Sequence, residues 1–331
     1  MAKRKKYLLG IDLGGTKVLA VLLNPRFGRV AEKKLKIEAN GGEKLFWRTM
    51  TQAVTGVLEE AGVPSKSLQT IGIGAPGMID FSEGKVLLAP NLSFLRNYPL
   101  GRRLRKTFGV SVTVENDVNA GLYGEYRFGA ARGYRHAVGI FPGTGVGGAF
   151  LLDGRIYRGA TGAAGEIGHI LMNLPSFSES PRGLETLENL TGRLAIAADA
   201  GYLILKQKAR NLFREVGGDL RKIKSKALSR AAKSGDTAIR DLITAKAKVL
   251  GIAMANVVNL LNPEVVVLGG GLMEALGKWV LPAAQQTMRR YALAPVVKSV
   301  KVVPAELGDY AVAVGAASLA YEALDKDRRG D

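Results

Sequence analysis

The chain has 331 residues, of which 47% are hydrophobic, so it can bury a full core and is long enough for two domains of ordinary size. It contains no cysteine and only two histidines, which excludes disulfides and thiolate metal sites and leaves any zinc site to rest largely on carboxylates. Its formal net charge is +18, a basic excess of the kind that can favour nucleic acids or anionic surfaces.

The basic excess is concentrated in one helical stretch. Between Lys206 and Lys248 the sequence has thirteen Lys or Arg against four Asp or Glu. The stretch lacks the interleaved aromatic residues on which single-stranded nucleic acids stack, so we expect a solvated helical face, while attraction of polyanionic metabolites stays open. No apolar run approaches the roughly 20 residues of a membrane span, and the basic start leads straight into a strand, so we expect a cytoplasmic protein.

Residues 7–23 predict two β-strands joined by a tight glycine turn. The turn is polar where its arms are apolar: Gly14 and Gly15 allow backbone N–H groups to face a phosphate, and Thr16 and Lys17 add a hydroxyl and a charge. Asp12 could hold a magnesium ion through water. The spacing is neither that of a P-loop nor that of Gly-x-Gly-x-x-Gly, and a plain hairpin is the alternative. Because a plain hairpin rarely has such a polar centre, we favour a phosphate site.

An α/β pattern follows the hairpin. The expected elements are, in order, a strand at 29–37, a covering helix at 43–61, a strand at 70–80 that runs into the turn Pro76-Gly77, a loop at 89–92, a short basic helix at 101–108 and an apolar strand at 110–114. Missing side chains at the Pro-Gly turn let a ligand approach the backbone. This order indicates a mixed α/β domain.

The segment Glu115–Ala120 lies between the last of these strands and a helix that we expect to begin near Asn119. Its carboxylate, Asp117, would lie at the mouth of a strand-to-helix turn, where open α/β sheets place their chemistry. The flanking amides of Asn116 and Asn119 could hold this carboxylate in one orientation and ionised, as a general base for a hydroxyl requires. The alternative is that Asn-Asp only caps the helix.

Residues 136–152 repeat the pattern of strand, glycine turn with a threonine, and strand, now with Gly143, Thr144 and Gly145 at the tip. Two such hairpins suggest a duplicated domain whose halves grip a nucleotide phosphate tail from both sides, although the second can also be a plain turn. Further expected elements are helices within 203–251, an apolar helix at 252–261, a buried strand at 265–268, a strand at 300–303 and a helix at 311–324. After the buried strand, Gly269, Gly270 and Gly271 would let an adenine or ribose lie on backbone, or form an ordinary strand-to-helix turn.

Five motifs together resemble the ROK sugar kinases, within the actin-like ATPase superfamily that includes hexokinases. They are Leu9–Lys17, similar to the first phosphate loop; Glu115–Ala120, similar to the catalytic segment; Gly143–Gly148, similar to the second phosphate loop; Gly162–His169, similar to the Gly-Glu-x-Gly-His signature; and Leu261–Gly271, similar to the adenosine-side loop. The resemblance implies an α/β fold of two actin-like ATPase (ribonuclease H-like) domains with a cleft between them. The first domain would be residues 1–118 plus 311–331, and the second residues 119–310.

The resemblance also implies a role for individual residues. Asp117 would take the proton from the sugar hydroxyl that is phosphorylated. The other sugar contacts would come from Gly77, Asn91, Asn116, Glu166, His169 and Glu188, with Glu185 as a weaker candidate for the place of Glu188. The nucleotide would be bound by Asp12, Gly14, Gly15, Thr16, Lys17, Gly143, Thr144, Gly145, Gly269, Gly270 and Gly271, with Mg²⁺ held by Asp12 through water.

One motif departs from the family. Where ROK proteins usually have Cys-x-Cys-Gly-x-x-Gly-Cys, the sequence reads Glu179–Thr186 and lacks all three thiolates, so we expect no zinc site. His169 is then interpreted as a sugar ligand, with local packing as the alternative, and the loop 173–186 must be ordered by its own contacts or by substrate. His136 precedes a strand with no partner in view and is expected at the surface.

These observations predict an ATP- and Mg²⁺-dependent hexose kinase that acts on the 6-hydroxyl, with glucose as the default and other hexoses or N-acetylhexosamines behind it. Polyphosphate stays open as a donor because the basic helices would suit it. The main alternative is a sugar-sensing protein that binds without phosphorylating. ROK repressors carry a winged helix ahead of the first strand, and only six residues precede Tyr7, which argues against that class. A homodimer is expected from the resemblance, and closure of the domains on sugar is expected because water in an open site would hydrolyse ATP.

Overall fold

The computed structural model describes residues 6–38, 40–172 and 185–329. The chain forms two compact units, one of residues 1–133, 154–164 and 309–331 and one of residues 134–153 and 165–308. This division differs from the border expected at 118/119. Helix α3 (Asp117–Phe128) lies in the first unit because it packs along α11 (Ala311–Arg329), a helix that follows the whole second unit in the sequence.

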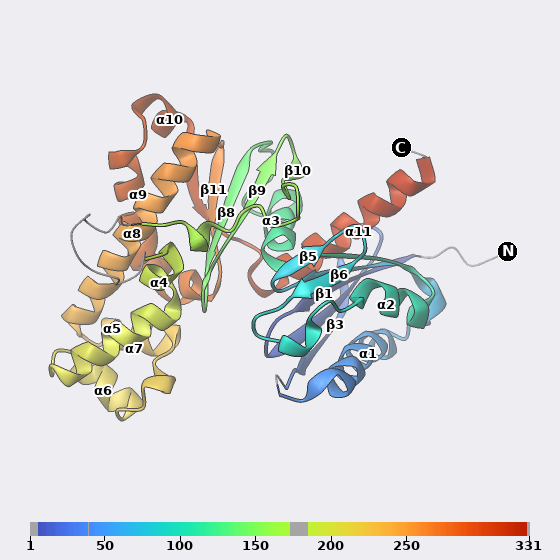
Figure 1. Ribbon diagram of the computed structural model, residues 1–331, viewed down its shortest axis with the longest axis horizontal. Coiled ribbons are helices and arrows are strands. Elements are labelled where there is room, and N and C mark those ends of the chain that lie inside the picture. The colour runs from blue at the N-terminus through green and yellow to red at the C-terminus, as the bar shows by residue number, and fades with distance from the viewer. Residues whose placement is uncertain (1–5, 39, 173–184, 330–331) are drawn as a thin grey trace. The chain divides into compact units, whose positions relative to one another are not determined.

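The sheet of the first unit has the strand order β3-β2-β1-β4-β7 (Figure 1). Its strands are β1 (Tyr7–Leu13), β2 (Lys17–Leu23), β3 (Arg29–Lys36), β4 (Leu68–Ala75) and β7 (Ser111–Asn116). The first three are antiparallel neighbours, and β4 runs parallel to both β1 and β7. The hairpin predicted at 7–23 is therefore confirmed.

The strand predicted to run into the turn Pro76-Gly77 is confirmed as β4, which ends at Ala75. A second strand that was not predicted, β5 (Met78–Asp80), follows the turn and pairs with β6 (Lys85–Leu88) in a separate small sheet. The break lies at Gly77, whose φ of 87° is in the left-handed region. A Cβ at this position would lie 2.0 Å from the carbonyl oxygen of Leu88, so the turn requires glycine.

Helices cover both faces of the first sheet, as the alternation of side chains along β1 dictates. Leu9 and Ile11 belong to a core with α1 (Gly42–Glu60) and α2 (Leu100–Phe108), whereas Leu8 packs against α11 on the other face. On that second face, Gly10 and Gly72 are paired across β1 and β4, and a Cβ on either would lie 1.9 Å from a backbone oxygen of α11. The small-residue helix therefore packs directly on the strand backbone.

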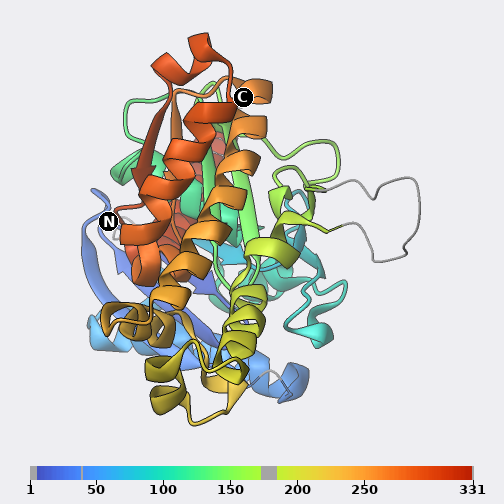
Figure 2. The same cartoon turned by 90° about the vertical axis from the view of Figure 1, so that its left-hand side faces the viewer.

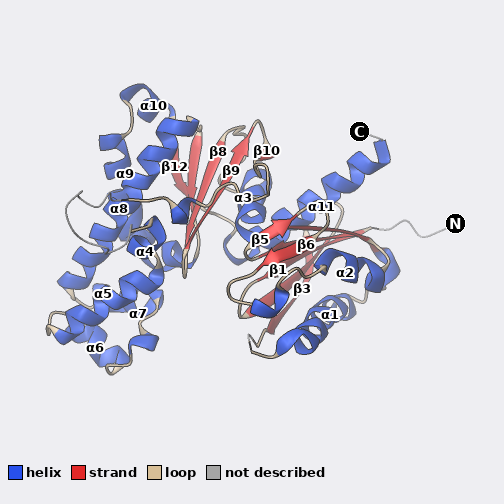
Figure 3. Ribbon diagram, in the orientation of Figure 1, coloured by secondary structure: helices blue, strands red, loops and turns tan. Residues whose placement is uncertain are grey.

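The second unit repeats this arrangement around the strand order β9-β8-β11-β12 (Figure 3). The strands are β8 (Ala137–Pro142), β9 (Val146–Leu152), β11 (Val265–Leu268) and β12 (Lys301–Pro304), and β10 (Arg155–Ile156) follows β9 along the chain. β8 and β9 form an antiparallel hairpin, and β11 runs parallel to β8 and β12. In both units a hairpin is thus followed by parallel strands, which is the duplication predicted from the two glycine turns.

The remaining helices all belong to the second unit. They are α4 (Leu187–Thr191), α5 (Arg193–Leu205), α6 (Arg210–Val216), α7 (Ser225–Lys233), α8 (Thr237–Leu261), α9 (Gly271–Tyr291) and α10 (Ala294–Ser299). The apolar helix expected at 252–261 is the end of α8, which runs side by side with α9 (Figure 2).

The basic stretch is mostly solvated, as predicted. Of its thirteen Lys and Arg residues, all but the half-buried Arg240 and Lys246 are exposed. Within the described ranges, no helix combines the length and apolar character that crossing a bilayer requires.

Candidate functional site

The tip of the β1–β2 hairpin is a tight turn closed by a hydrogen bond from the Gly14 N–H to the Lys17 carbonyl (2.9 Å). Gly15 lies against the side chain of Asn91: a Cβ added to Gly15 would be 2.9 Å from the Cβ of Asn91. The structure therefore brings together a residue predicted for the nucleotide and one predicted for the sugar. Thr16, at the same tip, is exposed.

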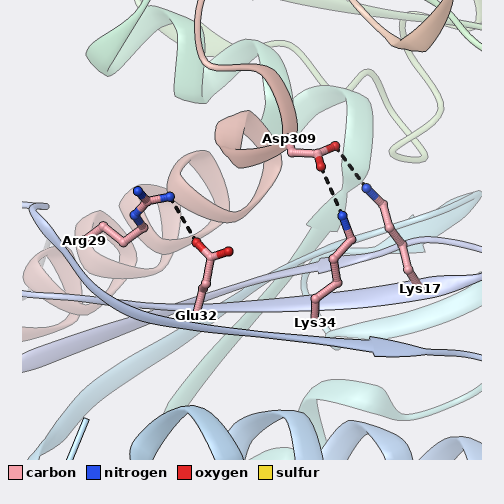
Figure 4. Close-up of polar contacts among 5 residues, drawn as sticks. All are labelled: Lys17, Arg29, Glu32, Lys34 and Asp309. Carbon is pink, nitrogen blue, oxygen red and sulfur yellow. Dashed lines mark hydrogen bonds and ion pairs between the residues drawn. The ribbon is translucent and has the colours of Figure 1, made fainter. Parts of the chain in front are cut away.

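Lys17 begins β2 and reaches a carboxylate far away in the sequence. Its Nζ lies 3.0 Å from Oδ1 of Asp309, and Nζ of Lys34 lies 3.2 Å from Oδ2 of the same residue (Figure 4). The hydrogen bond from Lys17, helped by Lys34, holds the pKa of Asp309 below its usual value against the effect of burial. The phosphate turn thus carries a lysine whose charge is already balanced within the first unit.

Asp12, on β1, has an unusual electrostatic environment. Burial raises the pKa of its carboxyl to about 6, and the nearby charge of Lys17 acts in the opposite direction. An ionised carboxylate in such a place is stabilised by a cation, so the residue suits the water-mediated Mg²⁺ predicted from the sequence.

The junction of β7 and α3 holds the predicted base. Asn116 is the N-cap of α3, and its Oδ1 accepts from the N–H groups of Val118 (2.9 Å) and Asn119 (3.1 Å). Asp117 is the first helical residue, half-buried, and its Oδ1 accepts from the Val118 N–H at 2.9 Å. The helix thus begins two residues earlier than expected, and the cap and the carboxylate are adjacent residues. The positive end of the helix dipole favours the ionised form of Asp117.

The two amides next to Asp117 make other bonds than those expected. Asn116 Nδ2 donates to the carbonyl oxygen of Gly77 (3.1 Å), and Asn119 Nδ2 donates to Oε1 of Glu115 (3.0 Å). The position of the carboxylate is therefore set by the first turn of α3. The bond to Gly77 brings the Pro-Gly turn against the catalytic segment, which joins two regions that the sequence had suggested separately.

The second hairpin, in the second unit, is closed by a hydrogen bond from the Gly143 N–H to the Gly145 carbonyl (2.7 Å). Glu188, on α4, lies directly on this tip: its Oε2 accepts from the Val146 N–H at 2.9 Å. A Cβ at Gly145 would lie 2.0 Å from that oxygen. Arg193 also contacts the tip, since its Nη2 donates to the hydroxyl oxygen of Thr144 (3.2 Å). Glu188, predicted for the sugar, is thus next to the second phosphate turn.

The backbone of the segment Gly165–His169 packs closely on the backbone of β9. A Cβ at Gly168 would lie 2.2 Å from the carbonyl oxygen of Val146, which explains why glycine is needed there. Glu166 and His169 lie on the exposed side, with Oε2 and Nε2 3.9 Å apart and about half or more of each side chain accessible. Neither side chain is packed into the core of the second unit.

The glycine triple lies beside the second hairpin. Gly270 is the N-cap of α9, with φ of 83°, and a Cβ there would be 2.8 Å from the Pro142 carbonyl oxygen. Gly271 begins the helix, and nothing lies within 4 Å of its Cβ position. The unit therefore groups its two predicted nucleotide segments at the carboxyl ends of β8 and β11.

A sequence model of the ROK family matches residues 8–323. The chain belongs to the ROK family. It is 32% identical over 328 residues to a glucokinase of Thermotoga maritima, covering 97% of this chain and 99% of that one. Over 308 residues it is 29% identical to a xylose repressor of Caldicellulosiruptor bescii, covering 93% of this chain and 76% of the repressor.

Among solved structures, this ROK chain is similar to a ROK family glucokinase of Streptomyces griseus in complex with glucose and AMPPNP. The TM-score is 0.81 at 30% identity, over 96% of this chain and 99% of that one. The fold is accordingly the two-domain actin-like ATPase fold predicted from the five motifs. The zinc-binding cysteines of the family are absent, and the predicted ordering of the loop 173–186 falls mostly on residues 173–184, outside the described part.

Sequence reasoning missed three groups of this ROK chain. Asp309 and Lys34 were missed because no local pattern links residues so distant in sequence. Glu115 was placed in the segment Glu115–Ala120 without a role of its own, whereas the structure places it, buried, in β7. His136, expected at the surface, has a side chain that is 40% exposed, and its Nε2 lies 3.6 Å from Oδ1 of Asp153, a neighbour that the sequence did not indicate.

Proposed function

We propose that this ROK protein transfers the γ-phosphoryl group of ATP to the 6-hydroxyl of a hexose, glucose first, with Asp117 as the general base. Sugar-kinase activity, a phosphotransfer to an alcohol group, is supported by glucokinase relatives that match nearly the whole chain. The observation that carries the catalytic assignment is the place of Asp117, half-buried on the first turn of α3 beside the Asn116–Gly77 bond.

On the sugar, the first unit supplies Asp117, Asn91 and Asn116, and the second supplies Glu166, His169 and Glu188. In direct phosphoryl transfer the protein itself forms no covalent bond with the reactants. Holding the hydroxyl in line with the phosphate therefore accounts for most of the rate acceleration. Asp117 accepts the proton of that hydroxyl as the bond to phosphorus forms. The hydroxyl of the bound sugar must therefore lie within about 3 Å of a carboxylate oxygen in the productive complex.

The nucleotide is bound by the two hairpin tips and the glycine triple through their backbone N–H groups. Lys17 exchanges Asp309 for phosphate oxygen when ATP arrives. Asp12 would hold Mg²⁺ through water, and the ion would neutralise phosphate charge. Asp12 suits this role because its buried carboxylate lacks a full counter-charge.

A coupled ADP-release assay tests the proposal. It uses a panel of glucose, mannose, fructose, allose and N-acetylhexosamines, each with ATP and with polyphosphate as donor; with polyphosphate, sugar phosphate is measured directly. Turnover with one hexose well above the ATP hydrolysis rate is the expected result. Sugar binding by calorimetry without turnover on any combination contradicts the kinase and favours a sugar-sensing protein; a xylose repressor is among the relatives.

A further inference from the structure

The carboxylate of Glu115 is among the most buried charged groups of the first unit. It belongs to β7, immediately before Asn116 and Asp117, and its side chain is 4% exposed. A carboxylate removed from water in this way is strongly destabilising unless hydrogen bonds and an opposite charge compensate it. The hydrogen-bond and ion-pair partners of Glu115 therefore indicate its structural role.

One oxygen of Glu115 fixes the strand-to-helix junction. Oε1 accepts from the N–H of Asn116 (3.0 Å) and from Nδ2 of Asn119 (3.0 Å). Asn119 is buried, and in the described part of the chain its Oδ1 has no hydrogen-bond partner. The bond to Glu115 is thus what orients the Asn119 side chain inside the first turn of α3, the turn that carries Asp117.

The other oxygen is held by an arginine from another part of the chain. Oε2 of Glu115 lies 2.7 Å from Nε and 2.6 Å from Nη2 of Arg158. The fork geometry of the guanidinium makes this a directional contact that lysine cannot reproduce. The guanidinium carbon also lies 4.9 Å from the ring centroid of Phe81, so the arginine is held on a second side.

Arg158 lies in the segment 154–164, which packs on the first unit. Its carbonyl oxygen accepts from the Ala164 N–H (3.1 Å), and Gly162 lies so close to the Ile79 carbonyl oxygen that a Cβ would be 2.7 Å away. The next residues along the chain are Gly165 and Glu166. One ion pair therefore fastens the turn that carries the proposed base to the segment 154–164 of the same unit.

We propose that Arg158 is a positioning residue for phosphoryl transfer, which acts through Glu115 to fix the first turn of α3 and hence the carboxylate of Asp117. The inference rests on the proposed kinase function. A displacement of a base by about 1 Å costs up to about a hundredfold in rate, so the pair acts on the chemical step rather than on ligand affinity.

The test compares Arg158→Met, Arg158→Lys and the control Arg155→Met. Arg155 is an exposed arginine in the same segment, three residues upstream. Steady-state kinetics are measured well below each melting temperature and expressed per nucleotide-binding site, counted by titration with a non-hydrolysable ATP analogue. This removes the contribution of unfolded protein. We expect Arg158→Met to lower kcat by about 10- to 100-fold, with the KM for sugar and for ATP within about twofold of wild type.

Arg158→Lys should recover only part of the lost kcat, and Arg155→Met should leave kcat unchanged. If Arg158→Met does not fold, Arg158→Lys alone decides, since a lower kcat at constant KM supports the proposal. A wild-type kcat per site in the folded variant overturns it and leaves the pair a structural one. Absence of turnover in the wild-type protein itself would refute the kinase function, and the positioning role with it.

Discussion

Replacing Asp12 with asparagine should stabilise the metal-free protein while removing its activity. The carboxyl of Asp12 has a pKa of about 6 in the folded chain and an ordinary value of 3.8. A difference of about two pH units corresponds to about 3 kcal/mol by which the ionised form is less stable in the folded than in the unfolded state. Asparagine has the same shape without the charge, so up to about 3 kcal/mol is recovered.

The pH dependence gives the sign of this effect. Because the folded pKa is raised, the penalty is fully present above pH 6, shrinks as the pH falls from 6 to 3.8 and is absent below that. Urea unfolding in EDTA at pH 8, 6 and 4.5 should therefore show a gain for Asp12→Asn that is largest at pH 8 and falls to about a third of that value, or about 1 kcal/mol, at pH 4.5.

Magnesium supplies the matched control for the same variant. Mg²⁺ with an ATP analogue should stabilise the wild-type protein more than Asp12→Asn, because only the carboxylate attracts the ion strongly. A stability difference that does not change with pH, or a loss of stability at pH 8, would show that the charge of Asp12 is not strained by burial and would refute the reasoning.

Three other variants test separate parts of the structure. Asp117→Asn should lower kcat by at least about 100-fold while calorimetry still detects sugar binding, and near-normal turnover would remove Asp117 from the role of base. Asp309→Asn should release Lys17 and lower the KM for ATP by up to about fivefold at low salt and less at high salt; an increased KM would mean that Asp309 instead holds the lysine in place. Gly72→Ala should destabilise the protein by about 2 kcal/mol or more in urea, since its Cβ would lie 1.9 Å from a carbonyl oxygen of α11. Gly121→Ala should be tolerated, because its Cβ would lie 3.6 Å from the side chain of Val312, and equal stabilities of the two variants would contradict the close packing.

Local patterns predicted much of the fold. The two hairpins, α1 and the strand at 265–268 follow from hydrophobic spacing and glycine turns, which depend on neighbours in sequence. The start of α3 was placed too late because a capping side chain, Asn116, replaces the loop that the pattern had left between strand and helix. The end of β4 was predicted by the Pro-Gly turn, where Gly77 has a left-handed backbone conformation, but the short strand β5 after it was missed.

Site residues that belong to short sequence motifs were predicted. Site residues whose role depends on a partner far away in the sequence were missed. The Lys17–Asp309 pair joins residues 292 positions apart, and Glu115 meets an arginine 43 positions away. Contacts between residues so far apart in the sequence produce no periodic sequence pattern. The same reason explains the domain border, because the helix that retains α3 in the first unit comes from the far end of the chain.

The close packing of α11 on Gly10 and Gly72 also affects the order in which the two units can fold during synthesis. The first unit is begun early in synthesis, yet one face of its sheet, on which only α3 packs before then, stays incompletely covered until residues 311–329 have left the ribosome. More than 170 residues separate α3 from α11 along the chain, which at about 5 to 20 residues per second is a delay of roughly ten seconds or more. The unit whose strands emerge first is therefore the one that finishes folding last.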